Sequence, residues 1–346
     1  MSYLQAIVIA LTQGVTELFP VSSLGHSVLL PAWLGGSWNT LVTQSAQANS
    51  SSSFYLAFIV ALHVGTALAL LWFFRADWIR IMGGFVRSVR RSIGQRRFSV
   101  GDSDERMAWL IVIATIPVGL VGLILEQTFR TVFAKPLAAS VFLLINGLIL
   151  LRGEGIARGA ERAKARAARR GPRSPRARSA APIAGGSGEP DSRAVAAGRH
   201  GGPRSAEELA AAYSSDVRIS RMPYSDSLRI GVLQITALFA GISRDGVTMV
   251  GGLWRGLSRE DAARFAFLLA TPPILAAGLL KIPSLTGSAG AHIHGQIIVG
   301  FVITTVTAYL SVRYLVRYFR AGRSLRPFAF YCLIVGLLSI IRFAAF

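Results

Sequence analysis

Two polar segments interrupt long apolar stretches of this chain, and their side chains are of types that can do chemistry. Residues 13–26 hold an amide, a carboxylate, two adjacent hydroxyls and an imidazole, and residues 243–248 hold a guanidinium beside further hydroxyls. Such groups are costly at membrane depth unless they face a cavity or each other. We therefore expect the two segments to meet at one site inside a membrane, where they would suit an anionic phosphate.

Arg244 supports this expectation most directly. A guanidinium inside a membrane needs an anionic partner, and it can hold a phosphate through two parallel hydrogen bonds. Neighbouring residues add hydroxyls and the backbone N–H groups of a restarting helix, which suit a phosphate: Ser243, Gly246 and Thr248. The alternative is a structural salt bridge from Arg244 to Asp245 or Glu17.

Gln13 and Glu17 are four residues apart, so they share one face of a helix. The carboxylate of Glu17 could hold a divalent cation, orient a water molecule or act as a base. The alternative for Glu17 is a buried partner for Arg244. Gln13 is equally a candidate for substrate binding and for a hydrogen bond between packed helices.

Ser22, Ser23 and His26 lie around the start of the next expected helix. Either serine can cap that helix, and one of them needs no further role. His26 follows Ser22 by four residues and Ser23 by three, so it shares their face and could serve as acid, base or nucleophile. His63 has no polar neighbours of this kind in sequence, and we interpret it as structural.

Composition places the chain among polytopic helical membrane proteins. Of its 346 residues 52% are hydrophobic and 16% are charged, and apolar runs of membrane-spanning length recur. The net charge of +20 is concentrated in the loops between these runs, which is the positive-inside pattern rather than a nucleic-acid surface.

The single cysteine, Cys332, excludes an intrachain disulfide and implies no metal cluster. Residues 1–19 lack Lys and Arg and do not read as an ordinary signal peptide.

Breaks in the apolar pattern predict how the helices run. Residues 3–11 are too short to span, and the break at Pro20 predicts a re-entrant pair whose second half-helix runs from about Ser22 to Leu34. Residues 228–257 repeat this pattern around the second polar segment. Spanning helices are expected at 54–74, 107–125, 137–151, 262–280, 296–314 and 328–346, and an exposed loop at 35–53.

Residues 152–222 differ in composition from the rest of the chain. They are rich in Ala, Arg, Gly, Pro and Ser with almost no large apolar residues, so we expect a basic, disordered cytoplasmic insert. Its Ala-rich pieces, Ile156–Arg170 and Ala206–Tyr213, are expected to form helix transiently. The insert separates a first membrane repeat, 1–151, from a second, 223–346. A solvated tether is the preferred interpretation over contact with anionic lipid.

The two membrane repeats align with each other. Gln13 to Ser22 and Gln234 to Ser243 are both nine residues, and each polar segment precedes three expected spans. Because three is odd, the second repeat starts on the opposite side of the membrane, and the basic loops then all fall in the cytoplasm, with both termini outside. The expected fold class is an all-α polytopic membrane protein with an inverted-topology repeat. Each half has a re-entrant broken helix pair plus three transmembrane helices, and the site lies near the midplane.

These motifs resemble those of the undecaprenyl-diphosphatase family, the bacitracin-resistance type of integral membrane phosphatase. The resemblance is carried by Gln13-xxx-Glu17, by residues 18–26 (Leu-Phe-Pro-Val-Ser-Ser-Leu-Gly-His), by residues 241–248 (Gly-Ile-Ser-Arg-Asp-Gly-Val-Thr) and by residues 259–273. It covers both membrane repeats but not the insert. Three positions depart from the family pattern: Gln13, where Glu is common although either is admitted, Ala240, where Pro is usual, and Asp245, where Ser is usual. An acid at position 245 repels phosphate unless it binds a metal or steers Arg244.

The resemblance implies hydrolysis of a C55 polyprenyl diphosphate to the monophosphate and inorganic phosphate, which recycles the carrier lipid for cell-wall synthesis. It also implies a divalent cation, Mg or Ca, with Glu17 as its candidate ligand, and a site that opens to the outer face of the cell membrane. The catalytic candidates are Glu17, His26 and Arg244. The candidates for substrate binding are Gln13, Ser22, Ser23, Ser243, Gly246 and Thr248. The attacking group is water, Ser23 or His26.

Transport is the alternative function. Inverted repeats with broken helices are a transporter architecture, so the chain could flip the polyprenyl monophosphate, alone or after hydrolysis. Expected partners are the polyprenyl diphosphate, membrane lipids and, as a candidate assembly, a second copy in a homodimer. No nucleic acid is expected as a partner.

Overall fold

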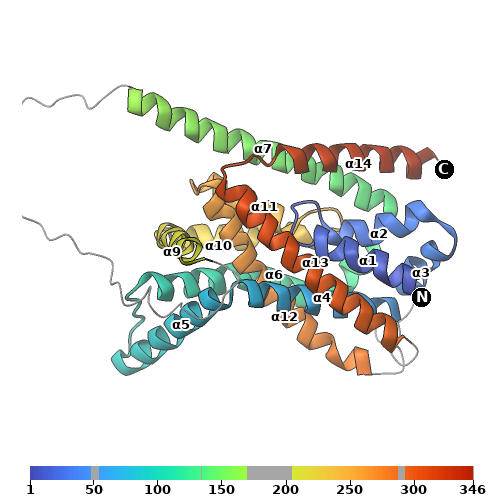
Figure 1. Ribbon diagram of the computed structural model, residues 1–346, viewed down its shortest axis with the longest axis horizontal. Coiled ribbons are helices and arrows are strands. Elements are labelled where there is room, and N and C mark those ends of the chain that lie inside the picture. The colour runs from blue at the N-terminus through green and yellow to red at the C-terminus, as the bar shows by residue number, and fades with distance from the viewer. Residues whose placement is uncertain (48–53, 134, 170–204, 287–292, 346) are drawn as a thin grey trace, which may run out of the picture.

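The computed structural model describes residues 1–47, 54–133, 135–169, 205–286 and 293–345, which contain helices and no strand (Figure 1). The first half folds, in chain order, into α1 (Tyr3–Thr16), α2 (Ser23–Leu34), α3 (Gly36–Gln47), α4 (Phe54–Phe73), α5 (Arg75–Gln95), α6 (Ser103–Phe133) and α7 (Pro136–Arg169). The second half folds into α9 (Ala206–Ser220), α10 (Tyr224–Gln234), the 3-10 helix η1 (Ile235–Leu238), α11 (Arg244–Trp254), α12 (Arg259–Thr286), α13 (His294–Arg320) and α14 (Arg326–Ala345).

Each membrane repeat begins with a helix pair that is interrupted inside the fold, α1 and α2 in the first and α10 and α11 in the second, as the sequence predicts. In the first half α2 is capped by Ser22, whose hydroxyl accepts a hydrogen bond from the N–H of Gly25. In the second half α11 is capped by Ser243, whose hydroxyl accepts one from the N–H of Gly246. These caps satisfy N–H groups that every helix start leaves without a partner, so the chain can restart a helix away from water.

Five of the described helices are long and apolar enough to cross a membrane: α6, α7, α12, α13 and α14. The pair α4 and α5 passes the same test and is bent by 85°, which raises the number to six. All of the expected spans therefore correspond to helices. The chain is an all-α, multi-pass membrane protein.

The last helices of the two halves, α7 and α14, lie side by side and run in opposite directions (Figure 1). Two glycines allow this close approach. A Cβ on Gly147 would lie 2.8 Å from Cγ of Leu333, and one on Gly336 would lie 2.8 Å from the backbone N of Leu144. The first half-helices of the two repeats, α1 and α10, also make equivalent contacts. Each packs on the second long helix of the opposite half, α1 on α13 and α10 on α6. Opposite directions and equivalent contacts fit an inverted repeat.

The described core consists of one large buried cluster and a smaller one. The largest fully buried side chains of the main cluster are Phe74, Phe265, Phe267 and Phe319. The smaller cluster, around Phe58, includes Leu41 of α3. Burial of Leu41 explains why residues 36–47 form a helix where the sequence predicts an exposed loop. Residues 48–53 of that expected loop lie outside the described residues.

The segment 152–222, expected to be disordered, is helical in both of its described parts. The spanning helix α7 continues to Arg169, beyond the expected end of the span at residue 151, and α9 occupies Ala206–Ser220. Residues 170–204 lie outside the described residues. Both described flanks are therefore helical, and they include the Ala-rich pieces, the first as far as Arg169, that the sequence marks as helix-forming.

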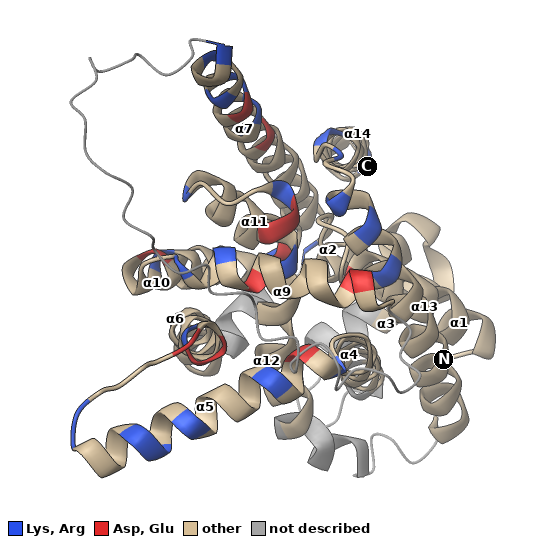
Figure 2. Cartoon of the chain, turned by 60° about the vertical axis from the view of Figure 1, so that its left-hand side comes forward, with Lys and Arg blue, Asp and Glu red and all other residues tan. Residues whose placement is uncertain are grey.

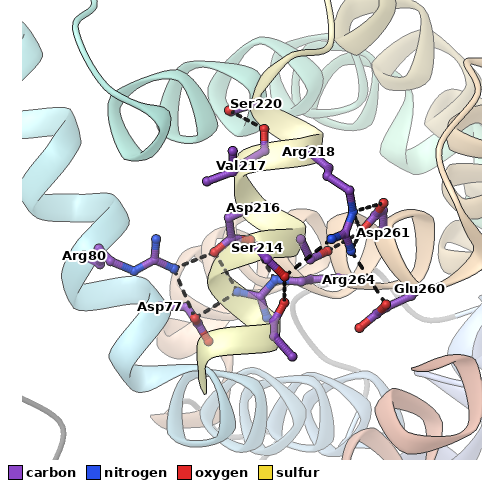
Figure 3. Close-up of polar contacts among 12 residues, drawn as sticks. Asp77, Arg80, Ser214, Asp216, Val217, Arg218, Ser220, Glu260, Asp261 and Arg264 are labelled. Atoms are coloured by element: carbon purple, nitrogen blue, oxygen red, sulfur yellow. Dashed lines mark hydrogen bonds and ion pairs between the residues drawn. The ribbon is translucent and has the colours of Figure 1, made fainter. Parts of the chain in front are cut away.

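Ion pairs with α5 and α12 hold α9 in place, as Figure 3 shows. Asp216 of α9 is fully buried, and Nε of Arg264 of α12 lies 2.7 Å from it. Arg80 of α5 binds the same carboxylate, and Arg218 of α9 pairs with Asp261 of α12 at 2.6 Å. Composition indicated disorder because α9 has few large apolar residues. The helix is anchored instead by charges whose partners lie in α5 and α12.

Candidate active site

The two interrupted helix pairs meet, and their backbones touch. Ser22 has a positive φ of 70° and its hydroxyl also accepts a hydrogen bond from the N–H of Gly241, at 3.1 Å. Gly25 and Gly241 approach so closely that a Cβ on Gly25 would lie 2.9 Å from Cα of Gly241. The expectation that the two polar segments come together is met by direct contact between them.

The carboxylate of Glu17 is the centre of this junction. Its Oε2 accepts hydrogen bonds from Nε2 of Gln13, at 2.8 Å, and from the hydroxyl of Ser23. Its Oε1 accepts one from Nη2 of Arg244, at 3.2 Å. The Glu17 side chain is 4% exposed and that of Arg244 is 24% exposed. The geometry is thus compatible with both interpretations of Arg244. The structural salt bridge to Glu17 exists, and the partly exposed guanidinium is still accessible to a phosphate.

His63, which the sequence analysis treated as structural, lies beside this carboxylate. Its Nε2 is 3.5 Å from Oε2 of Glu17 and 3.4 Å from Nε2 of Gln13. Its Nδ1 donates to the carbonyl of Ile59 at 2.9 Å, so Nε2 is the nitrogen that faces the site. His63 could have been predicted as a site residue from sequence. Ionisable residues are rare inside spanning helices, so each such residue is a functional candidate.

His26 is oriented by contacts of its own. Its Nδ1 donates to the carbonyl of Ser22 at 2.7 Å, and its Nε2 lies 2.8 Å from the hydroxyl of Tyr331, whose ring stacks on the imidazole. Among the described residues it makes no hydrogen bond to Glu17. It does line a pocket together with Gln13 and Ser23. The expected role of His26 as acid, base or nucleophile stays a prediction.

The second polar segment is almost wholly buried. Thr248, four residues after Arg244 on α11, is 1% exposed, and Asp245 is 2% exposed. Oδ2 of Asp245 has no hydrogen-bond partner among the described residues. The hydroxyls of Ser22 and Ser243 serve as helix caps, and the N–H of Gly246 is used by the second cap. Their direct contact with substrate, expected from sequence, stays a prediction.

Asn146 of α7 is a further residue that the sequence analysis missed. It is fully buried and hydrogen-bonds the backbone of both interrupted pairs, at Pro20 and at Ser243. The sequence shows a polar residue, Asn146, within an apolar run, which marks it as a candidate. It does not show the partners of Asn146, because those lie far away in sequence.

The site offers hard oxygen donors that suit a divalent cation. The described residues contain no cluster of three or more His, Cys, Asp or Glu. Glu17 provides one carboxylate, with the hydroxyl oxygen of Ser23 beside it, while Gln13 turns its Nε2 toward the carboxylate and carries its amide oxygen on the same group. Mg²⁺ commonly binds through one or two carboxylates and completes its coordination with waters and substrate phosphates. The residues present fit such an ion, provided that the substrate contributes oxygens.

Fold and site together define the class of protein: a polytopic membrane protein with a buried carboxylate and guanidinium where two interrupted helix pairs meet. The family model described as bacitracin resistance protein BacA matches residues 6–180 and 204–338. The chain belongs to this family.

Its relatives carry a consistent name. An undecaprenyl-diphosphatase 2 of Frankia alni is 53% identical over 99% of this chain and 98% of the relative. An undecaprenyl-diphosphatase of Mycolicibacterium paratuberculosis is 49% identical over the same shares, 99% and 98%. A more distant undecaprenyl-diphosphatase 2, from Chromobacterium violaceum, is 35% identical over 99% of both chains. The similarity includes the whole length of the fold and not only the motifs.

Proposed function

We infer that this chain is an integral membrane phosphatase that hydrolyses undecaprenyl diphosphate to undecaprenyl phosphate and inorganic phosphate. The observation that carries the inference is the contact between Glu17 and Arg244 at the junction of the interrupted helix pairs. The names of relatives that match nearly the whole chain support the substrate. The reaction regenerates the carrier lipid for peptidoglycan synthesis, and this recycling underlies resistance to bacitracin.

Arg244 is the residue assigned to the diphosphate. Its hydrogen bond to Glu17 uses Nη2, and its side chain is 24% exposed, so further N–H groups remain for phosphate oxygens. It stands in the first turn of α11, where the helix dipole favours an anion. Phosphoryl transfer depends mainly on positioning and on charge stabilisation, and this placement supports both.

Glu17 is the residue assigned to activation of the attacking group. The hydroxyl of Ser23 donates to its carboxylate, so Glu17 can take a proton from Ser23 or from a water molecule that replaces this contact. His26 lines a pocket together with Ser23 and is the third candidate for attack. Trapping a phosphorylated enzyme and locating the modified residue separates Ser23 and His26 from water.

A divalent cation would be held by Glu17, with Gln13 or Ser23 beside it, and would supply positive charge to the diphosphate oxygens. Gln13 keeps the carboxylate in place through its hydrogen bond at 2.8 Å, so its side chain contributes to the site whether or not it touches the ion. A chelator should abolish phosphate release, and addition of Mg²⁺ or Ca²⁺ should restore it.

The site is proposed to open toward the outer face of the cell membrane. Figure 2 shows Lys and Arg gathered along α5 and at the far end of α7. Positively charged loops favour the cytoplasm, which would put these segments inside. Labelling of single cysteines introduced into α5 and near the C-terminus, in intact cells, tests this orientation. Labelling of α5 from outside would reverse it.

Lipid transport is the second candidate function, favoured by the opposed halves and their interrupted helices. Purified protein in detergent distinguishes the two, because detergent has no sides across which a lipid can be flipped. The test is release of inorganic phosphate from undecaprenyl diphosphate, with and without chelator. Release that depends on the cation supports the phosphatase. No release with any cation removes the phosphatase and leaves transport.

A further inference from the structure

Asn146 connects the two interrupted helix pairs from a third helix. Its Nδ2 donates a hydrogen bond to the carbonyl of Pro20 at 3.0 Å, and its Oδ1 accepts one from the N–H of Ser243 at 3.0 Å. Pro20 belongs to the first interruption and Ser243 to the second. One carboxamide therefore holds both interruptions, with its donor directed to one half of the chain and its acceptor to the other.

These two backbone contacts are adjacent to the residues that form the site. Pro20 follows Glu17 by three residues, and Ser243 directly precedes Arg244. The position of the backbone decides where each side chain begins, so a shift at either contact changes the distance between carboxylate and guanidinium. Asn146 itself is fully buried, and it does not belong to the residues that line the pocket.

The helix that carries Asn146 is fixed at the same level. Gly147 packs against α14 so tightly that a Cβ there would lie 2.9 Å from the carbonyl oxygen of Ala329. Bulky side chains cannot enter this crossing, and α7 cannot slide along α14 without a clash. Asn146 thus projects from a helix that is closely packed at this level, which suits a group that orients reactive residues.

The chemistry of the side chain also matters. An amide offers a donor and an acceptor at once, as the carbonyl of Pro20 and the N–H of Ser243 require. Asp would keep the acceptor and lose the donor, and Ala would lose both. Each loss leaves a buried backbone group without its partner, so the interruptions would move to find another.

We propose that Asn146 is a positioning residue of the phosphatase site, which sets the spacing of Glu17 and Arg244 by holding the backbone of both interruptions. This role rests on the proposed function. The residue acts through Glu17 and Arg244 and makes no contact with substrate.

The first experiment compares Asn146→Ala and Asn146→Asp with wild type by steady-state phosphate release from undecaprenyl diphosphate, per folded molecule. Misplacement of reacting groups by about 1 Å can cost roughly a hundredfold in rate. We expect Asn146→Ala to lower kcat at least about tenfold. Asn146→Asp, which keeps the bond to Ser243, should lie between Asn146→Ala and wild type, and it remains informative if Asn146→Ala does not fold.

Cys332→Ala is the matched control. Cys332 of α14 is as buried as Asn146. Its Sγ accepts a hydrogen bond from Nδ2 of Asn146 at 3.4 Å and donates a long one, 4.0 Å, to the carbonyl of Pro20, but among the described residues it bonds neither Ser243 nor Arg244. A defect of packing around Asn146 would appear in this variant too. We expect its turnover to stay within about threefold of wild type, since neither backbone bond of Asn146 is removed.

A double-mutant comparison separates positioning from stability. In a background of Arg244→Lys the guanidinium is absent, so its spacing no longer matters, and Asn146→Ala should then lower kcat much less than it does in wild type. Its effect on the midpoint of thermal unfolding should be the same in both backgrounds. Equal loss of kcat in both backgrounds, or unchanged kcat in a folded Asn146→Ala protein, would overturn the positioning role while leaving the proposed function intact. Absence of phosphate release by wild type would overturn both.

Discussion

Glu17 and Arg244 are separated by more than two hundred residues, yet Oε1 of the carboxylate lies 3.2 Å from Nη2 of the guanidinium. Each residue stands at an interruption between two helices, one in each half of the chain. The contact therefore exists only when the halves are assembled. It explains why neither motif can form a phosphate site alone.

Glu17→Gln should abolish most turnover and leave the protein folded. Glutamine keeps the shape of the side chain and can still bond Ser23, but it lacks the negative charge needed for proton transfer or for a cation. The measurement is phosphate release at saturating substrate and cation, together with the midpoint of thermal unfolding. Rates close to those of wild type would make Glu17 a structural partner of Arg244.

Gly241→Ala should impair activity because this glycine lies where the two interruptions meet and is packed against α7 with no room for a side chain. Gly241 has a φ of +112°, and a Cβ there would lie 2.4 Å from the carbonyl oxygen of Ala139. Gly256→Ala is the matched control, since Gly256 has a φ of +87° but no heavy atom within 4 Å of a Cβ. We expect both variants to carry backbone strain and only Gly241→Ala to lose phosphate release strongly. Equal activity in the two variants would mean that the close approach is not needed.

Asp216→Ala should destabilise the protein because it removes the fully buried carboxylate that Arg264 and Arg80 share, which leaves Asp77 to Arg264 and Asp77 and Asp104 to Arg80. The carboxylate is fully buried and pairs with Arg264, whose side chain is 7% exposed. Removal of one member of a buried ion pair typically costs about 3–5 kcal/mol. Glu208→Ala is the control, because Glu208 is 22% exposed and its nearest cations are 3.7 Å or more away. Thermal unfolding in detergent should show a much larger loss for Asp216→Ala, and similar losses would contradict the docking of α9.

Replacement of residues 170–204 by a Gly/Ser linker of equal length should leave turnover within a few-fold of wild type. The ion pairs of α9 and the extended α7 are retained in this variant. A wider replacement, from Ala157 to Ser220, would remove Asp216 and Arg218 and should reduce stability. The measurements are phosphate release and thermal unfolding of both variants. A hundredfold loss of turnover in a folded 170–204 variant would assign a role in the reaction to the replaced residues.

Much of the fold could be predicted from sequence because local signals agree with it. Pro20 and the serine caps interrupt helices, and apolar runs of spanning length continue them. The meeting of Glu17 and Arg244 could also be predicted, because isolated intramembrane charges need partners. Such arguments depend on the type of residue and on its immediate neighbours.

Contacts between distant segments could not be predicted in this way. Asp216 reads as part of a polar, alanine-rich segment, and only the fold reveals that Arg80 and Arg264 surround it. His63 approaches Glu17 from another helix, and His26 turns instead toward Tyr331. Side chains on one helix can be ordered by spacing, but the rotation of one helix against another depends on packing in three dimensions.

Arg244→Lys tests the central claim most directly, through kcat/KM for phosphate release from undecaprenyl diphosphate. Both side chains are cations, but Lys is a compact charge without the planar fork that holds a phosphate at two points. Loss of an interaction that strengthens in the transition state lowers turnover as well as binding. We expect a loss of at least about tenfold, roughly 1.4 kcal/mol, with membrane insertion and thermal stability unchanged. If Lys supports the reaction as well as Arg does, residue 244 only balances the charge of Glu17, and Arg244 does not clamp the phosphate.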